Sequence, residues 1–86
     1  MNINNLISIV KKKLEDNIII EKIEIEDKSF LHKNHVGNSN DKFHLKLIIS
    51  SKKLMKKNKV ERTKEIYRLL DYEIKNYIHS LQILIN

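Results

Sequence analysis

The most informative feature of this 86-residue sequence is what it lacks, since it contains no cysteine, proline, tryptophan or alanine and has one glycine. Without cysteine the chain can form neither a disulfide scaffold nor a zinc–thiolate site, and it has no thiol nucleophile. One glycine excludes a dinucleotide-binding fingerprint and a phosphate loop, because each requires several glycines at fixed spacing. The sequence therefore predicts a soluble globular domain without a nucleotide cofactor.

Long apolar runs are also missing. The longest uninterrupted runs have three residues, as at 18–20 and 47–49, whereas a membrane-spanning helix needs about 20. The first ten residues have neither the basic region and cleavage site of a secretory signal nor the Arg and Ser richness of a transit peptide. We therefore expect one domain over residues 1–86 that does not cross a membrane. The expected compartment is the cytoplasm or the mitochondrion, with any presequence already removed.

The charge balance is basic, with 17 Lys and Arg against 11 Asp and Glu, a formal net charge of +6. Such an excess in a short chain ordinarily indicates nucleic acid or an anionic surface as the partner. However, 15 of the 17 cations are Lys, and Ile, Lys and Asn together supply 40 of the 86 residues. An A/T-rich genome favours the codons of these three residues, so base composition explains much of the excess. The charge alone is weak support for a nucleic-acid partner.

The first part of the chain predicts a helix followed by a strand. Apolar residues at helical spacing indicate an amphipathic helix over residues 3–15, which Asp16 and Asn17 are expected to end. Residues 18–26 are rich in isoleucine and alternate in polarity toward their end, which is typical of a half-buried strand.

A long loop and a second strand are predicted next. Residues 27–42 are polar and contain the only glycine, so they predict a long exposed loop, a kind of segment that often carries function. Residues 43–49 predict a strand that Ser50 and Ser51 end. The apolar run at 47–49 indicates that this strand is central and covered on both faces.

The second half of the chain predicts two helices and a third strand. Residues 52–57 can form one short helical turn, and Asn58 with Glu61 has the spacing of a capping box that begins a longer helix. The apolar residues expected along one face of that helix are Val60, Ile66, Leu69, Leu70, Ile74 and Tyr77. Alternation over residues 79–85 predicts the last strand, with His79 on the same face as Leu81. The element order is α-β-β-α-α-β.

The four histidines are the candidates for metal chemistry. His32 and His35 lie in the predicted loop, while His44 and His79 begin the second and third strands. His32 and His35 are close enough for both imidazoles to approach one metal ion, although a spacing of three is weak support by itself. The plainer alternatives are two solvated loop histidines and a partly buried His79 that bonds a backbone carbonyl.

Catalysis has little support in the sequence. No Ser-His-Asp arrangement can be recognised from spacing, and a serine nucleophile needs a base and an oxyanion donor. The carboxylates of Glu24 and Glu26 lie on one strand face two residues apart, which is typical of a solvated sheet edge. We therefore do not expect an enzyme.

A basic segment spans the short helical turn and the start of the long helix, in a helix-turn-helix-like stretch. Its residues are Lys52, Lys53, Lys56, Lys57, Lys59, Arg62 and Lys64. Contact with phosphates would give this segment a salt-dependent affinity for nucleic acid. Residues that read base edges are few here, so binding to DNA would be weakly specific. The alternative is a solvated lysine face in a lysine-rich protein.

Several motifs together resemble the BolA family over nearly the whole chain. Residues 27–32 (Asp-Lys-Ser-Phe-Leu-His) resemble the acidic-x-Ser-x-x-His opening of that family's variable loop, and residues 44–51 resemble its His-Phe-x-Val strand ending in Ser. Leu54 stands at the usual Phe. Residues 62–67 resemble the Arg-His-Arg-x-Val-Tyr helix, and residues 78–81 (Ile-His-Ser-Leu) resemble the Ile-His-Ala-Leu motif. The joint spacing is specific, whereas each piece alone is weak.

The resemblance implies a fold and a role. The fold is α/β (α+β), like a class II KH domain, with a three-stranded sheet and helices on one face. The implied role is a non-enzymatic adaptor that is a monomer alone and a heterodimer with a monothiol glutaredoxin. The two proteins share a glutathione-ligated [2Fe-2S] cluster in iron-sulfur cluster maturation or iron signalling, and the adaptor binds no cofactor when alone.

The resemblance also implies the ligands. His79 and His32 match the family's C-terminal and loop ligand positions, with His35 the competing loop candidate. Because the chain has no cysteine, thiolates must come from the partner, and histidine ligation would raise the cluster potential and make binding sensitive to pH. DNA binding with transcriptional regulation, also known in the family, is the alternative. Thr63 in place of His, Lys56 in place of Gly and the missing Gly-x-x-Gly loop depart from related patterns and weaken RNA binding of the KH type.

Overall fold

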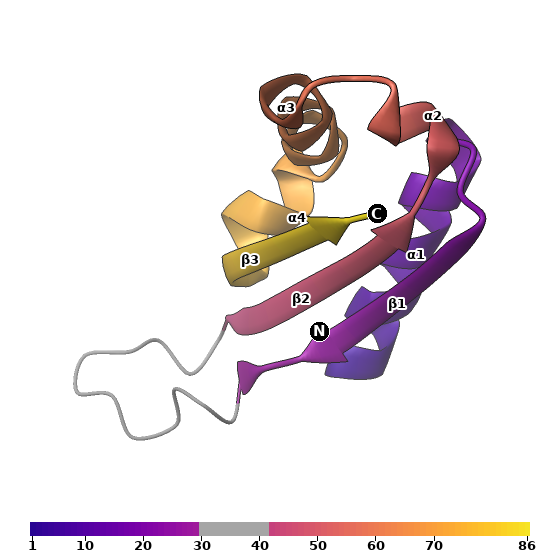
Figure 1. Ribbon diagram of the computed structural model, residues 1–86. Helices are drawn as coiled ribbons and strands as arrows, with labels where there is room; N and C mark the ends of the chain where they lie inside the picture. Colours follow the sequence, from indigo (N-terminus) through magenta and orange to yellow (C-terminus); the bar gives the residue numbers. More distant parts are fainter. Residues whose placement is uncertain (30–41) are drawn as a thin grey trace.

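The chain forms a three-stranded sheet with helices packed on one face (Figure 1). The computed structural model describes residues 1–29 and 42–86. Its elements are α1 (Ile3–Asn17), β1 (Lys22–Asp27), β2 (Phe43–Ser50), α2 (Lys52–Met55), α3 (Lys59–Leu69), α4 (Asp71–Asn76) and β3 (Ile78–Ile85). The predicted order is confirmed, except that the long helix is divided in two. No helix in the described ranges is long and apolar enough to span a membrane.

Helix α1 covers one half of the sheet with an apolar stripe. Its buried residues Leu6, Val10 and Leu14 follow the helical period. At its start the Asn2 side chain accepts a hydrogen bond from the Asn5 N–H at 2.8 Å. The helix continues to Asn17, two residues beyond the predicted end. The side chain of Asn17 donates to the backbone carbonyl of Lys13 at 2.7 Å, so a residue expected to end the helix instead supports its last turn.

The isoleucine run at residues 18–20 is a connection rather than the start of a strand. Ile18 is buried, and its N–H donates to the Leu14 carbonyl at 2.9 Å, which closes the end of α1. Ile19 is exposed. Strand β1 begins at Lys22, four residues later than predicted. A β-branched run is therefore used here to cap a helix over the core, a role that propensity alone cannot distinguish from a strand.

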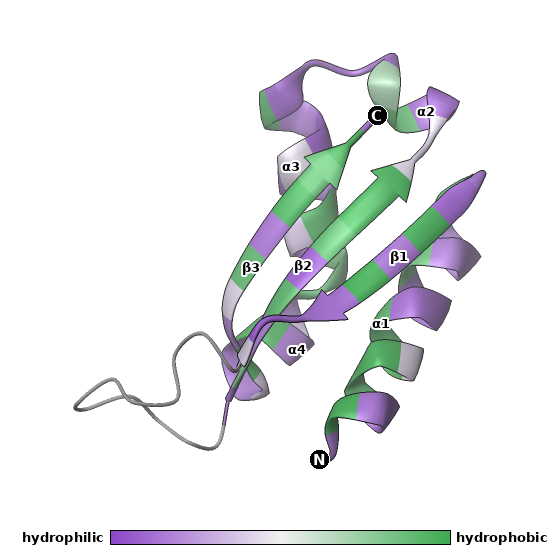
Figure 2. Cartoon of the chain, turned by 60° about the horizontal axis from the view of Figure 1, so that its bottom comes forward, coloured by the Kyte–Doolittle hydropathy of each residue, from purple (hydrophilic) through white to green (hydrophobic). Residues whose placement is uncertain are grey.

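The strand order is β1-β2-β3, with β1 antiparallel and β3 parallel to the central β2. In register, Leu47 lies opposite Ile25 on one side and Ile83 on the other. The helix-covered face of β2 buries Leu45, Leu47 and Ile49, while Ile48 on the opposite face is only half-buried. Figure 2 shows hydrophobic and hydrophilic residues alternating along β1. The prediction of a central β2 is confirmed, but among the described residues its second face is not covered by helices.

The predicted long helix breaks at Leu70. Its start is as expected, because the Asn58 side chain accepts from the Glu61 N–H at 2.9 Å. Leu70 has φ −102° and ψ 16°, which is outside the helical region, and α4 then runs in a new direction. Val60, predicted to face the core, is 62% exposed. The break allows Leu70 to be buried and α4 to approach α1.

Two buried polar side chains, Ser51 and Glu73, join segments that are distant in the sequence. The Ser51 hydroxyl, which is buried, accepts from the Leu54 N–H at 3.1 Å and donates to the Ile19 carbonyl at 2.8 Å, so it both caps α2 and holds the α1–β1 connection. The Lys13 ammonium donates to both carboxylate oxygens of Glu73 at 2.8 and 2.9 Å. This ion pair links α1 to α4.

Candidate functional site

The histidine residues of the described chain gather at one end of the sheet. Because β2 and β3 are parallel, both begin at that end, and β1 finishes there. Four polar side chains lie close together at this place: Ser29 after β1, His44 at the start of β2, and His79 and Ser80 at the start of β3. We call these four residues the histidine site.

A β-bulge determines where His79 lies. Phe43 pairs with Ile78, but His44 pairs with Ser80, so His79 is an extra residue without a partner position on β2. Ile78 is buried and Leu81 is half-buried, while His79 is exposed. The predicted alternation, with His79 on the same face as Leu81, is therefore wrong. The alternative of a partly buried His79 is also wrong, because the bulge turns this imidazole outward.

His44 is the buried member of the site, with 4% of its surface exposed. Its Nδ1 lies 2.6 Å from the Ser80 Oγ, and its N–H donates to the Ser29 Oγ at 3.0 Å. Its carbonyl accepts from the Lys28 N–H at 2.7 Å. The ring packs against that of His79, with centroids 5.0 Å apart and planes inclined by 55°. Hydrogen bonds therefore hold His44 in place, and the ring of His79 packs against it.

The sequence motif at residues 27–29 has a local structural role at this site. Asp27 accepts from the Ser29 N–H at 3.0 Å through its Oδ1, in an Asx-type turn. This turn aims the Ser29 hydroxyl at the backbone of His44. Asp27 and Ser29 were predicted only as motif positions, and no contact was predicted for either. No pattern within a single element indicates a bond between positions 15 residues apart.

The nearby Tyr77 does not add charge to the site. Interaction with the Tyr72 side chain raises the pKa of the Tyr77 phenol above its ordinary value of 10.0, and the two rings lie 6.0 Å apart. Its phenol thus stays neutral at physiological pH. The Tyr77 carbonyl accepts from the Phe43 N–H at 2.8 Å, which anchors the start of β2 to the residue before β3.

The site offers one exposed imidazole as a metal ligand. Neutral imidazole is a good ligand for iron, zinc and copper. Within residues 1–29 and 42–86, no three His, Asp or Glu side chains are grouped as a metal site. These ranges therefore give His79 no group of three metal ligands to belong to. The two other predicted ligands, His32 and His35, lie outside the described residues.

The basic segment lies at the opposite end of the sheet. Helix α2 follows the end of β2, while the histidine site lies at its beginning (Figure 1). All seven basic side chains are exposed or half-buried. Lys57 pairs with Glu65 at 3.2 Å and accepts from the Arg62 guanidinium at 2.9 Å through its carbonyl. Eight residues of β2 separate the two ends, about 25 Å at the usual rise.

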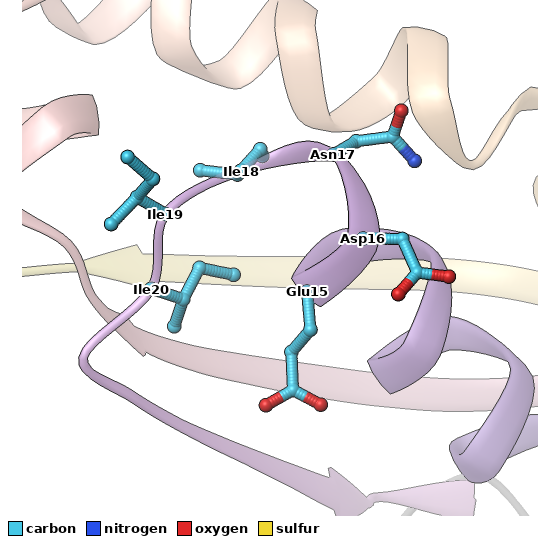
Figure 3. Close-up of a pocket in the computed structure, with 6 residues that line it drawn as sticks. All are labelled: Glu15, Asp16, Asn17, Ile18, Ile19 and Ile20. Carbon is cyan, nitrogen blue, oxygen red and sulfur yellow. The ribbon is translucent and has the colours of Figure 1, made fainter.

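A hollow at the end of α1 carries no recognisable chemistry. It is lined by the consecutive residues 15–20. Figure 3 shows that the Glu15 and Asp16 carboxylates point away from the isoleucine side chains of the connection. No histidine contributes to it, and its walls come from a single stretch of chain. The histidine site and the basic segment remain the candidates.

The order α-β-β-α-α-α-β, with β3 parallel to β2 and the helices on one face, defines a class II KH-like α+β domain in which the helix before β3 is divided into α3 and α4. Residues 14–86 match the family model described as "BolA-like protein". The chain therefore belongs to the BolA family.

Curated relatives extend this match. "Protein BOLA1, chloroplastic" of Arabidopsis thaliana is 32% identical over 84 residues, covering 94% of this chain and 52% of that protein. "SufE-like protein 1, chloroplastic/mitochondrial" of the same plant is 34% identical over 79 residues, covering 86% of this chain and 21% of the relative. "DNA-binding transcriptional regulator BolA" of Haemophilus influenzae is 31% identical over 75 residues, with 87% and 70% covered. The chain thus spans about half of the first relative and about a fifth of the second.

Solved structures agree on the fold. The BolA domain of SufE1 from Arabidopsis thaliana has a TM-score of 0.79 at 29% identity, covering 100% of this chain and 93% of that one. BolA1 from the same plant has a TM-score of 0.78 at 30% identity, with 92% and 87% covered. The four-helix, three-strand arrangement of the described residues is therefore that of a BolA domain.

Proposed function

We propose that this chain is a non-enzymatic adaptor that binds a monothiol glutaredoxin and shares or accepts a [2Fe-2S] cluster in cluster maturation or iron signalling. The observation that carries the proposal is the exposed imidazole of His79 at a β-bulge, supported by the buried ring of His44 at 5.0 Å. A ligand held on a strand by a rigid base loses little conformational freedom when it binds a metal that another protein presents.

The ligands that this chain can supply fit a cluster shared with a partner rather than a cluster that this chain binds alone. His79 supplies one nitrogen ligand, and a chain without cysteine supplies no thiolate. Glutathione and the glutaredoxin would provide the sulfur ligands, and histidine in place of thiolate would raise the cluster potential. A second nitrogen would come from His32, with His35 the alternative. The chain alone is then expected to bind no cluster.

The relatives support the coarser part of this proposal. Their names describe a SufE-like protein, a BolA protein and a BolA transcriptional regulator, and none of the three names describes a reaction. The plant relatives are named as chloroplastic or mitochondrial. A mitochondrial or cytoplasmic site of action remains the prediction for this chain.

The test is a titration of a [2Fe-2S]-loaded monothiol glutaredoxin with the full chain, followed by visible absorption and circular dichroism. We expect the wild type to change both spectra and His79→Ala to abolish the change. His32→Ala and His35→Ala, compared in parallel, identify the loop ligand as the one whose loss also removes it. Unchanged spectra with the wild type, or a full response from His79→Ala, would refute the proposal. Thermal unfolding of each variant checks that the fold is intact.

A second candidate function is nucleic-acid binding by a transcriptional regulator. It is favoured by the exposed basic segment and by the relative named as a DNA-binding transcriptional regulator. Gel shifts over a salt series should then show binding that weakens as salt rises. Charge reversal at Lys56, Lys57 and Lys59 should abolish it. Absence of binding by the wild type at low salt would eliminate this candidate.

A further inference from the structure

A groove separate from the histidine site runs between α3 and the outer edge of β3. It is lined by Lys59, Arg62, Thr63, Ile83, Leu84 and Ile85. Tyr67, one helical turn after Thr63, continues the line of α3 residues and donates its hydroxyl to the Leu81 carbonyl at 3.4 Å. The groove therefore follows the second half of β3, with its basic end beside Ile85. We call it the edge groove.

The backbone of β3 along this groove is directed outward. Asn86 directly follows β3. Its N–H donates to the Ile49 carbonyl at 2.9 Å, and its carbonyl accepts from the Ser51 N–H at 3.0 Å, so the backbone groups of Asn86 point toward β2. Backbone groups of successive residues in a strand point to opposite sides, and the contact of Tyr67 with Leu81 agrees with this alternation. The N–H and C=O groups of Ile83 thus point away from β2.

No strand covers this edge in the described part of the chain, because β3 pairs with β2 alone. The Leu81 carbonyl already accepts from Tyr67, but the outward groups from Ile83 onward are available to a further strand. Side chains around the edge are apolar and accessible, since Leu84 and Tyr67 are both among the exposed large hydrophobic residues. An uncovered strand edge beside exposed apolar side chains is the arrangement in which proteins accept an extended peptide.

The charged residues of the edge groove determine which side chains a bound peptide should carry. Lys59 and Arg62 lie at its basic end, and neither forms an ion pair with a carboxylate of the described residues, whereas the neighbouring Lys57 pairs with Glu65. Two cations without carboxylate partners beside an apolar floor favour an acidic side chain.

Nucleic acid fits this groove less well. The six lining residues include no aromatic ring on which bases could stack, and the neighbouring Tyr67 offers one ring rather than a row of them. The α2–α3 linker at residues 56–58 also lacks a glycine to let a phosphate backbone approach closely.

We propose that the edge groove binds an extended segment of a partner protein, which adds to β3 as a fourth strand and places an acidic side chain against Lys59 and Arg62. The backbone groups of Ile83 provide the strand pairing, and the two cations provide selectivity. This binding mode uses no residue of the histidine site, so it does not depend on cluster binding.

Synthetic peptides test the proposal with the isotope-labelled full chain. Each peptide has about eight alternating valine and threonine residues, enough to span the edge, and ends in two glutamates, two glutamines or two lysines. We expect the glutamate peptide to shift the backbone amide resonances of Ile83 and Ile85. Its Kd should be about tenfold lower than that of the glutamine peptide, the gain typical of a paired charge.

Charge-reversed variants supply the matched control. Lys59→Glu with Arg62→Glu should transfer the preference from the glutamate to the lysine peptide, and Lys64→Glu, on the same helix but outside the groove lining, should leave it unchanged. Equal binding of all three peptides, or shifts confined to the open face of the sheet, would overturn the proposal. So would tighter binding of a single-stranded oligonucleotide in the same groove. Resonance shifts of the β3 edge that depend only on protein concentration would instead identify self-association.

Discussion

At the scale of single residues, the ion pair between Lys13 and Glu73 is asymmetric in its surroundings. The Lys13 side chain is 37% exposed, whereas that of Glu73 is 5% exposed. If either partner is removed, the lysine can still reach water but the carboxylate cannot. Glu73 therefore carries most of the desolvation penalty of this ion pair.

This asymmetry predicts the order of stability among variants. Lys13→Met should lower the free energy of unfolding by ~2 kcal/mol, because it leaves a buried carboxylate without its cation. Glu73→Gln should cost ~1 kcal/mol or less, since the lysine turns outward. Urea unfolding of both variants, with Lys12→Met as the exposed control, measures the difference. A larger loss for Glu73→Gln than for Lys13→Met would contradict this account.

Ser51 and Ser50 are adjacent serines with different roles. Ser51 is buried and satisfies both the Leu54 N–H and the Ile19 carbonyl, whereas the Ser50 hydroxyl bonds the Asn86 side chain at the surface. Ser51→Ala should therefore destabilise the protein by about 2 kcal/mol, from the lost cap and the unsatisfied carbonyl. Ser50→Ala should change stability by less than about 0.5 kcal/mol. Thermal melts of the two variants decide, and equal melting temperatures would show that the buried contacts add nothing.

At the scale of elements, periodicity predicted the three strands and the order of the elements, but not the division of the long helix into α3 and α4. α1, β2 and α2 were predicted within two residues of their observed ends, and in α1 the buried residues follow the helical period throughout. The break at Leu70 and the late start of β1 were missed. Both arise from tertiary contacts: Leu70 leaves helical geometry where α4 turns toward α1, and Ile18 is buried as a helix cap.

The histidine site could be predicted in composition but not in geometry. The resemblance identified His79, and the motif included Ser29 and His44. No sequence pattern predicted the bulge that turns His79 outward, because a bulge depends on the register between β2 and β3. Likewise, the bond between His44 and Ser80 joins residues 36 positions apart. The edge groove was missed because a strand edge exists only once the strand order is known.

The corrected face of α3 can be tested by two alanine substitutions. Val60 was expected in the core but is exposed, while Leu70 is fully buried beside the break. Val60→Ala should change stability by less than about 0.5 kcal/mol, and alanine's helix propensity offsets the lost methyl groups. Leu70→Ala should cost about 2–5 kcal/mol through lost burial and the cavity it leaves. Chemical denaturation measures both, and a Val60→Ala loss comparable to that of Leu70→Ala would restore the original prediction.

At the scale of the whole molecule, the chain separates its two candidate activities along the sheet. The histidine site lies where β2 begins, and the basic segment follows where β2 ends. In the described residues the basic segment has one ion pair, between Lys57 and the neighbouring Glu65 on α3. Screening at physiological salt acts over about 8 Å, well below the length of the strand. The charges at one end therefore have little direct effect on ligands at the other.

This separation predicts that the two activities are independent under mutation. His79→Ala should abolish the spectral response with glutaredoxin while leaving any salt-dependent gel shift within about twofold of wild type, because the variant changes no charge near α2. Reversal of Lys56, Lys57 and Lys59 should do the opposite. Both activities are measured on both variants. The coupling free energy between the histidine site and the basic segment should be near zero. A strong loss of nucleic-acid binding in His79→Ala would mean that the ends communicate through the sheet, since both variants keep the core residues of β2 intact.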